Sequence, residues 1–203
     1  MTALPVALAL LLAGQAVPPR AQPVRPPAPA GLSWEDADYV SGTLARIERR
    51  LGAGKPASRQ PIVVTERQLN SYVRLSVKLP PALTSLELGL QKDTLLARGS
   101  LDLDQVKSRM TTGAGLLALL SGTVPVELRG RLSTAEGKGR VEVEQATVGG
   151  ISLPSSLVAQ IVSQSTKSPE RPQGFDIFAP FPLPYTARRV RLEPGRALVE
   201  FYQ

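Results

Sequence analysis

Cysteine and histidine are both absent from this 203-residue chain. Without them the chain cannot form disulfides, thiolate or histidine metal sites, thiol nucleophiles or a Ser-His-Asp triad. Aromatic residues are also scarce, at 4% of the chain with a single tryptophan, so the interior must be built mainly from aliphatic side chains. These absences favour a binding or structural protein over an enzyme, and we predict no catalytic residues, no cofactor and no metal site.

The first sixteen residues are an apolar segment unlike the rest of the chain. Residues 3–13 are apolar, and a run of about eleven residues is too short to span a bilayer but typical of the core of a signal peptide. The segment Gly14-Gln15-Ala16 supplies the small residues that a signal peptidase reads. We therefore predict that residues 1–16 are a signal peptide and that the protein is exported, to the periplasm or the extracellular face of a cell envelope. No Lys or Arg precedes the apolar run, so an apolar N-terminus without an export role is the alternative.

Proline dominates the next stretch of the chain. Residues 17–31 contain six prolines, which prevent regular helix and sheet. Such a composition is typical of an extended, polyproline-like tether that holds a domain away from a membrane or wall. We predict that residues 32–203 form a single α+β domain, with a helix at 33–51 and a sheet-and-helix body at 61–203.

Three segments carry the three- and four-residue apolar spacing of amphipathic helices. The first, residues 33–51, begins at a capping residue, Ser33, and the second follows a Thr65–Gln68 capping box. The third covers residues 154–165, with a proline in its first turn. The residues expected on the buried sides of these helices are Trp34, Ala37, Val40, Leu44, Ile47, Leu51, Leu69, Tyr72, Val73, Leu157, Val158, Ile161 and Val162.

Alternation of apolar and charged residues with a period of two predicts three antiparallel hairpins. They cover residues 85–104, 124–144 and 190–201. A two-residue turn in the first hairpin would place Leu90 opposite Leu95, and in the second we predict Leu128 opposite Val143. One face of such a sheet is apolar and needs a cover, which the amphipathic helices supply. The predicted fold class is therefore α+β, with a curved antiparallel sheet of hairpins packed on two or three helices.

Patterns that could support catalysis are few, and each has a simpler structural interpretation. Residues 113–118 match a G-x-G-x-x-A fingerprint, but polar residues precede them where a dinucleotide site requires a buried strand. Asp102 and Asp104 share one predicted strand face, as do Glu142 and Glu144. Arginines accompany both pairs, which is typical of a solvated sheet face and not of a desolvated acid/base site.

On the second predicted helix, Asn70 and Tyr72 form the polar pair of greatest interest. The amide of Asn70 can hydrogen-bond the edge of a sheet or an inserted loop. Such a role is structural more often than catalytic, so we predict a structural hydrogen bond at this position.

Positive charge exceeds negative charge, with 24 Lys and Arg against 17 Asp and Glu. Basic proteins meet nucleic acid, anionic lipid or acidic polymers. The cations are scattered, and no aromatic residues interleave with them as single-stranded nucleic acid binding requires. We therefore predict no nucleic acid partner. A solvated basic surface is the first interpretation, and contact with an anionic membrane surface is the functional alternative. The densest group of cations is Arg188, Arg189, Arg191 and Arg196.

Several short motifs resemble those of bacterial envelope domains of unknown function. Residues 64–72, VTERQLNSY, resemble their T-E-x-x-L-N opening, and residues 122–126, 148–154 and 183–184 resemble later parts. Those domains are similar to the tubular lipid-binding (TULIP-like) proteins. The resemblance covers about residues 61–203 and does not include the helix at 33–51. It implies a strongly curved antiparallel sheet that wraps a helix around an apolar tunnel, with lipid or another apolar ligand and no catalytic residues.

The sequence thus predicts an exported, non-enzymatic protein that binds a lipid or lipid-like envelope molecule inside a curved sheet. The predicted wall and mouth residues of the ligand site are Leu88, Leu90, Leu101, Leu103, Leu116, Leu117, Leu120, Val126, Leu128, Val141, Val143, Phe178 and Phe181. The same residues would serve equally well as a closed core. The alternative function is a structural or interaction domain that binds a protein or cell-wall partner through a basic surface.

Overall fold

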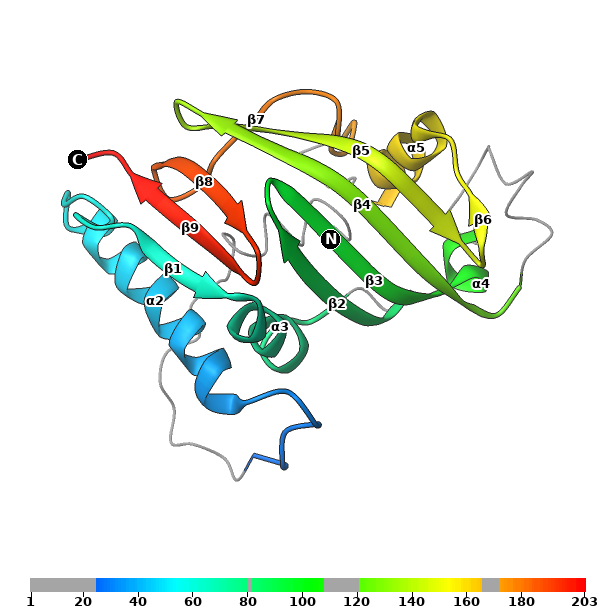
Figure 1. Ribbon diagram of the computed structural model, residues 1–203, viewed down its shortest axis with the longest axis horizontal. Coiled ribbons are helices and arrows are strands. Elements are labelled where there is room, and N and C mark those ends of the chain that lie inside the picture. The colour runs from blue at the N-terminus through cyan, green and yellow to red at the C-terminus, as the bar shows by residue number, and fades with distance from the viewer. Residues whose placement is uncertain (1–24, 80–81, 108–120, 166–171) are drawn as a thin grey trace.

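The computed structural model describes residues 25–79, 82–107, 121–165 and 172–203. In these residues helices and antiparallel strands form a mixed α+β fold, as the sequence predicted (Figure 1). A six-stranded sheet has the order β2-β3-β4-β5-β6, with β7 also paired to β5, and a three-stranded sheet has the order β1-β9-β8. The helices are α2 (Trp34–Gly52), α3 (Glu66–Leu75), α4 (Leu103–Lys107) and α5 (Ser155–Ser165). The strands are β1 (Ile62–Thr65), β2 (Leu83–Gln91), β3 (Thr94–Asp102), β4 (Thr123–Ala135), β5 (Lys138–Val148), β6 (Ile151–Ser152), β7 (Phe181–Pro182), β8 (Ala187–Glu193) and β9 (Arg196–Phe201).

The first two helices begin at the predicted caps. The Ser33 side chain accepts a hydrogen bond from a backbone N–H in the first turn of α2. At α3 the backbone N–H of Gln68 donates to the Thr65 hydroxyl, and the Gln68 side chain accepts from the Thr65 N–H, which completes a capping box. An ion pair of 3.0 Å between Arg67 of α3 and Asp36 of α2 joins the two helices.

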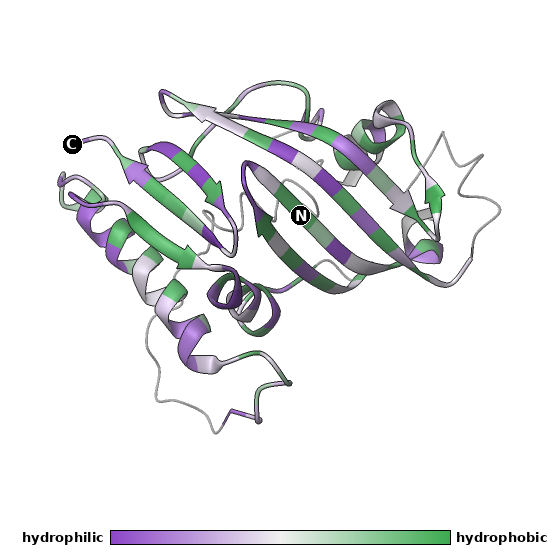
Figure 2. Cartoon of the chain, in the orientation of Figure 1, coloured by the Kyte–Doolittle hydropathy of each residue, from purple (hydrophilic) through white to green (hydrophobic). Residues whose placement is uncertain are grey.

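The six-stranded sheet places apolar and charged side chains on opposite faces. Leu90 lies opposite Leu95 as predicted, and the alternation continues across β4 and β5, seen as coloured bands along the strands (Figure 2). We call the apolar face, which packs against the helices, the inner face, and the charged face the outer face. One row across the inner face is Leu88, Ala97, Leu128 and Ala146, and the adjacent row on the outer face is Glu87, Arg98, Glu127 and Thr147.

The third predicted hairpin forms, but it belongs to the smaller sheet. Strands β8 and β9 pair Val190 with Val199, and β9 also pairs with the early strand β1. The Thr134 hydroxyl of β4 donates to the Val190 carbonyl at 2.6 Å and accepts from its N–H at 2.9 Å. The Thr134 side chain therefore bonds the N–H and the carbonyl of Val190 that a neighbouring strand would otherwise use. As a result, β4 and β8 contact each other but belong to separate sheets.

Helix α3 covers the edge strand β2 through side-chain hydrogen bonds. The Asn70 amide donates to the Leu88 carbonyl and accepts from the Leu88 N–H, both at 2.7 Å. One turn earlier, the Glu66 carboxylate accepts from the Leu90 N–H at 2.6 Å. The predicted structural role of Asn70 at a sheet edge is thus confirmed. The bonds also explain why this edge needs no further strand, because side chains pair its backbone groups.

The predicted pairing of the second hairpin is wrong. Leu128 lies opposite Ala146 and Val143 lies opposite Gly130, because the turn contains only Glu136 and Gly137 and a bulge follows Arg129. Both turn residues have positive φ, at 47° and 73°, as a tight two-residue hairpin turn requires. Leu128 and Val143 nevertheless share the inner face. Val143 lies opposite Gly130, and Leu128 is on the same face as Gly130 because the extra residue of the bulge is on β5 and the alternation along β4 is unbroken.

A second correction concerns the end of the first hairpin. Leu103 is the first residue of α4 and not a strand residue, because Asp102 ends β3 and caps the helix. The Asp102 carboxylate accepts hydrogen bonds from Gln105 and from the Asp104 N–H, and the bonds from Gln105 are the main reason that its pKa is lowered. The two aspartates therefore do not share a strand face.

The end of the predicted tether contacts the first helix. The Arg25 guanidinium forms an ion pair with Asp38 at 2.7 Å and lies 4.7 Å from the centre of the Trp34 ring. The Trp34 indole N–H donates to the Pro26 carbonyl at 2.8 Å. These contacts hold the last part of residues 17–31 against α2. The predicted signal peptide and residues 17–24 lie outside the described part of the chain.

Candidate apolar binding surface

The inner face of the large sheet contributes to two apolar clusters. The first, the α2 cluster, joins α2, α3, the small sheet and strand β2, and in it Leu88 and Leu90 are only 1% and 3% exposed. The second, the α5 cluster, lies where β3, β4 and β5 face α4 and α5. Its buried members are Leu103, Ala146, Val148, Leu153, Val158, Val162 and Ile177. Its half-buried members are Leu101, Val124, Val126, Leu128, Val143, Leu157, Ala159 and Phe175.

The half-buried side chains of the α5 cluster form a strip across neighbouring strands. Leu101 of β3 lies opposite Val124 of β4, and two residues further along β4, Val126 lies opposite Val148 of β5. Leu128 continues the strip along the same face. Aliphatic side chains that stay partly accessible on one face are the feature that an apolar ligand requires, because their remaining surface can still be removed from water.

The predicted ligand residues are divided between the α2 cluster and the α5 cluster. Leu101, Val126, Leu128 and Val143 lie together in the α5 cluster and remain half-buried, with Leu103 fully buried beside them. Leu101 also contacts the α2 cluster, to which Leu88, Leu90, Val141 and Phe181 belong. Leu88 and Leu90 are buried within the α2 cluster and have little surface left for a ligand. Leu116, Leu117 and Leu120 lie outside the described residues.

The segment that precedes the small sheet forms one border of the α5 cluster. The rings of Phe175 and Phe181 lie 5.6 Å apart, and Phe181 packs so closely on Gly139 that a β-carbon there would lie 2.7 Å from its ring. Ile177 is buried, whereas Phe178 is 49% exposed. From this segment the sequence prediction named Phe178 and Phe181 as mouth residues, but it did not name Val124 of β4 as a part of this surface. Its only sequence signal was an apolar side chain in an extended segment.

A small apolar hollow lies apart from this surface, between α2 and the three-stranded sheet. Its volume is about 40 Å³, which accommodates about three water-sized groups and not an acyl chain. It is lined by Val40, Thr43, Leu44, Ile47, Ile62, Val64, Val190, Ala197, Val199 and Phe201. Because none of the predicted wall residues borders it, the hollow is a packing feature of the α2 cluster and not the predicted ligand site.

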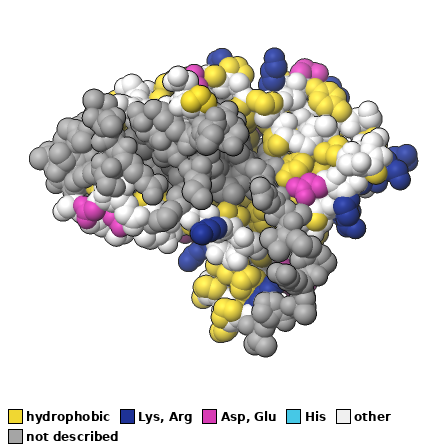
Figure 3. Space-filling model, turned by 180° about the vertical axis from the view of Figure 1, so that it is seen from behind, with side chains coloured by type: hydrophobic (Ala, Val, Ile, Leu, Met, Phe, Trp, Pro, Cys, Tyr) yellow, Lys and Arg dark blue, Asp and Glu magenta, His cyan; other side chains and the backbone are white. Residues whose placement is uncertain are grey.

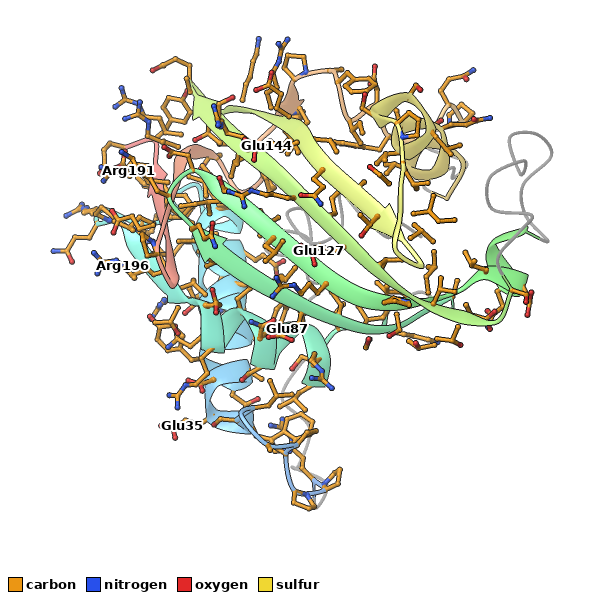
Figure 4. All side chains as sticks on the ribbon, turned by 45° about the vertical axis from the view of Figure 1, so that its right-hand side comes forward. Glu35, Glu87, Glu127, Glu144, Arg191 and Arg196 are labelled. Atoms are coloured by element: carbon orange, nitrogen blue, oxygen red, sulfur yellow. The ribbon has the colours of Figure 1, made fainter. Side chains whose placement is uncertain are left out.

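The outer face of the large sheet is a lattice of ion pairs. Arg98 lies 3.1 Å from Glu127, and Arg129 and Arg131 both bind the carboxylate of Glu144, at 3.1 and 2.9 Å. The labelled glutamates of the sheet project from this face in Figure 4. Glu144, one of the carboxylates considered for acid/base chemistry in the sequence, is thus part of a charged surface with arginine partners, as the structural interpretation predicted.

A second polar cluster joins α2, α3 and the loop before β8. The Tyr185 hydroxyl donates to the Glu48 carboxylate at 3.0 Å. Burial, followed by this hydrogen bond and the Glu48 charge, raises the pKa of Tyr185, and burial followed by the same charge raises the pKa of Tyr72. Both phenols therefore stay protonated at neutral pH, so they can donate hydrogen bonds but cannot act as bases.

These raised pKa values predict how the stability of the protein changes in alkali. An unfolded tyrosine loses its proton near pH 10, whereas folded Tyr185 keeps it, so the stabilisation is complete below about pH 10 and is lost as pH rises towards the folded pKa. We expect the free energy of unfolding, measured in urea, to fall above about pH 10, and to fall less in Tyr185→Phe. Tyr39→Phe, at an exposed position, is the control. An equally steep fall in Tyr185→Phe would contradict the prediction.

The comparisons with known proteins found no relative of this chain. No protein-family model matches the chain, and neither the curated proteins nor the solved structures show significant similarity to it. Among the described residues, no helix is both long and apolar enough to cross a membrane. Within the same residues, no three acidic side chains gather in a way that could hold a metal ion.

Proposed function

We propose that this protein binds a lipid or another apolar envelope molecule on the half-buried strip of the α5 cluster. The observation that carries the proposal is the contrast between two sets of inner-face residues in one sheet. Leu88 and Leu90 are closed off by α3, whereas Leu101, Val126 and Leu128 keep part of their surface accessible. Burying an acyl chain against such residues contributes about 0.8 kcal/mol per CH₂ before ordering costs are subtracted.

A binding role fits the polar groups better than a catalytic one. Glu127 and Glu144 of the outer face bind arginines, and Asp102 caps a helix. Tyr72 and Tyr185 are held in their protonated form. The proposal includes export to the cell envelope, which is supported by the apolar segment at residues 1–16. The motif resemblance to envelope domains similar to the TULIP-like proteins points to the same class of ligand.

The first test is native mass spectrometry of the protein purified from bacterial membrane extract. We expect a bound species of lipid mass, and we expect Leu128→Gln to remove it, because the amide would be desolvated against the bound chain. In a titration with 11-(dansylamino)undecanoic acid, the same substitution should weaken binding at least tenfold. This loss corresponds to about 1.4 kcal/mol, less than the transfer free energy of two methylene groups.

Leu96→Gln is the matched control for this experiment. Leu96 is also a half-buried leucine of the large sheet, but it lies on the outer face opposite Arg129. The same chemical change there should leave ligand binding intact. Equal loss of ligand in both variants would show that the substitution acts through general destabilisation, and an apo mass after lipid exposure would reject the proposal.

A closed structural or interaction domain is the second candidate. It is favoured by the α2 cluster, whose buried residues border a hollow of only about 40 Å³, too small for an acyl chain. This candidate predicts that the α5 cluster takes up no probe at all and that Leu128→Gln changes stability alone. The titration therefore separates the two functions in a single series.

A further inference from the structure

Cations without a carboxylate partner gather at one end of the molecule. This end is formed by the C-terminal half of α2, the loop that follows it, and the beginning of β8 (Figure 1). The Gln203 side chain donates to the Ser58 carbonyl at 3.4 Å and joins the end of the chain to that loop. Seen from behind, this end carries several Lys and Arg side chains, drawn dark blue at the right of Figure 3. We call Arg46, Arg49, Lys55, Arg59 and Arg189 the basic end.

Outside the basic end most of the described arginines bind a carboxylate, and the exceptions are Arg50, Arg74 and Arg140. On the outer face of the large sheet, Arg98, Arg129 and Arg131 each bind a carboxylate. On the small sheet, Arg191 and Arg196 do the same, at 2.8 and 2.7 Å. Among the described residues, no member of the basic end forms such a pair.

The carboxylates that lie at this end do not neutralise it. Glu48 binds the Tyr185 hydroxyl, and Glu136 forms a long 3.5 Å pair with Arg188 that is mostly exposed on both sides. Glu200 lies opposite Arg189 in the β8–β9 ladder, but its carboxylate binds Arg191 at 2.8 Å. The dipole of α2 accounts for Arg49 in its last turn, since cations stabilise a helix C-terminus. It does not account for Lys55 and Arg59, which follow the helix, or for Arg189 on a strand. Unpaired like charges repel one another, so their gathering on several elements calls for an anionic partner.

We infer that the basic end docks on the anionic phospholipid headgroups of a bilayer surface. The cations come from a helix end, a loop and a strand, so they are spread over one end of the molecule and do not follow a single element. A flat anionic surface can meet cations spread in this way, whereas single-stranded nucleic acid requires aromatic stacking platforms along a groove. Tyr202 is 42% exposed and packs against Gly137 of the β4–β5 turn, whose N–H donates to the Arg188 carbonyl. An exposed tyrosine at this end is suited to the headgroup level, where tyrosine is enriched.

Vesicle co-sedimentation of the full chain tests this inference. Vesicles of phosphatidylcholine alone give the baseline, because the apolar residues 1–16 could enter any bilayer, and vesicles with one-quarter phosphatidylglycerol, by mole, add the negative charge. We expect tighter binding to the charged vesicles and loss of that difference at high salt. Each cation near an anionic surface contributes about a fivefold change in affinity. The double variant Lys55→Gln/Arg59→Gln should therefore bind the charged vesicles at least tenfold more weakly.

Arg74→Gln/Lys78→Gln is the matched control, because it removes an exposed Arg from the last turn of α3 and an exposed Lys from the segment that follows the helix. It changes the net charge equally and should alter vesicle binding less than twofold. Equal weakening in both variants would show that only net charge matters and would overturn the inference, as would equal binding to neutral and charged vesicles. Tighter binding to a short single-stranded DNA at the same salt would overturn it in favour of nucleic acid. The outcome does not depend on the proposed apolar ligand, because the residues proposed to bind that ligand are unchanged in these variants.

Discussion

Replacing Asn70 with alanine is expected to destabilise the fold by about 3–5 kcal/mol. The Asn70 amide is buried and satisfies both backbone groups of Leu88, at 2.7 Å each. Alanine would leave a buried N–H and a buried carbonyl of Leu88 without partners, and each unsatisfied group costs about 1–3 kcal/mol. Because Leu88 is among the most completely buried side chains, water cannot easily replace the lost bonds.

Guanidinium denaturation of Asn70→Ala beside Arg74→Ala measures this effect. Arg74 is an exposed residue of the same helix, so its replacement should change stability by no more than about 0.5 kcal/mol. If Asn70→Ala lost less than about 1 kcal/mol, water or a shifted backbone would have to satisfy Leu88. That result would contradict the conclusion that side chains of α3 satisfy the backbone groups at the β2 edge.

Replacing Gly99 with alanine is expected to destabilise the protein by about 2–4 kcal/mol. Gly99 lies on the inner face of β3 opposite Leu86, beside the irregular pairing between Leu83 and Ser85. A β-carbon at this position would overlap the backbone carbonyl oxygen of Ser85. Because a backbone atom cannot rotate away like the end of a side chain, strands β2 and β3 would have to separate at the irregularity.

Gly89→Ala is the control, since it adds the same methyl group to the neighbouring strand. There the new β-carbon would lie 3.4 Å from the Leu96 β-carbon, which is ordinary contact. We expect a change within about 0.5 kcal/mol, or slight stabilisation, because alanine restricts the unfolded chain more than glycine does. Thermal unfolding of the two variants checks the difference, and similar melting temperatures would contradict the predicted clash at Gly99.

The local elements of this fold follow from the sequence because their signals lie within a few residues. Ser33 and the Thr65–Gln68 pair mark helix starts, and both caps form. The first hairpin has the predicted register because a tight turn fixes which residues face each other. The predicted register of the second hairpin is wrong because its turn lies at Glu136-Gly137, and the bulge beyond it, which leaves no clear mark in an alternating pattern, shifts Leu128 by one further residue.

The arrangement of these elements was decided by the tertiary structure. Strand β1 pairs with β9 across most of the chain length, and no short-range pattern encodes such a partner. The candidate binding surface also depends on tertiary packing. Leu88 and Leu128 carry the same alternation and lie in one row of the inner face, yet one is 1% exposed and the other half-buried. The sequence by itself determined which face of the sheet is apolar, because side chains alternate along every strand. Only the packing of α3 and α5 decided which part of that face is closed and which part remains accessible, because burial depends on what the rest of the chain places above each residue.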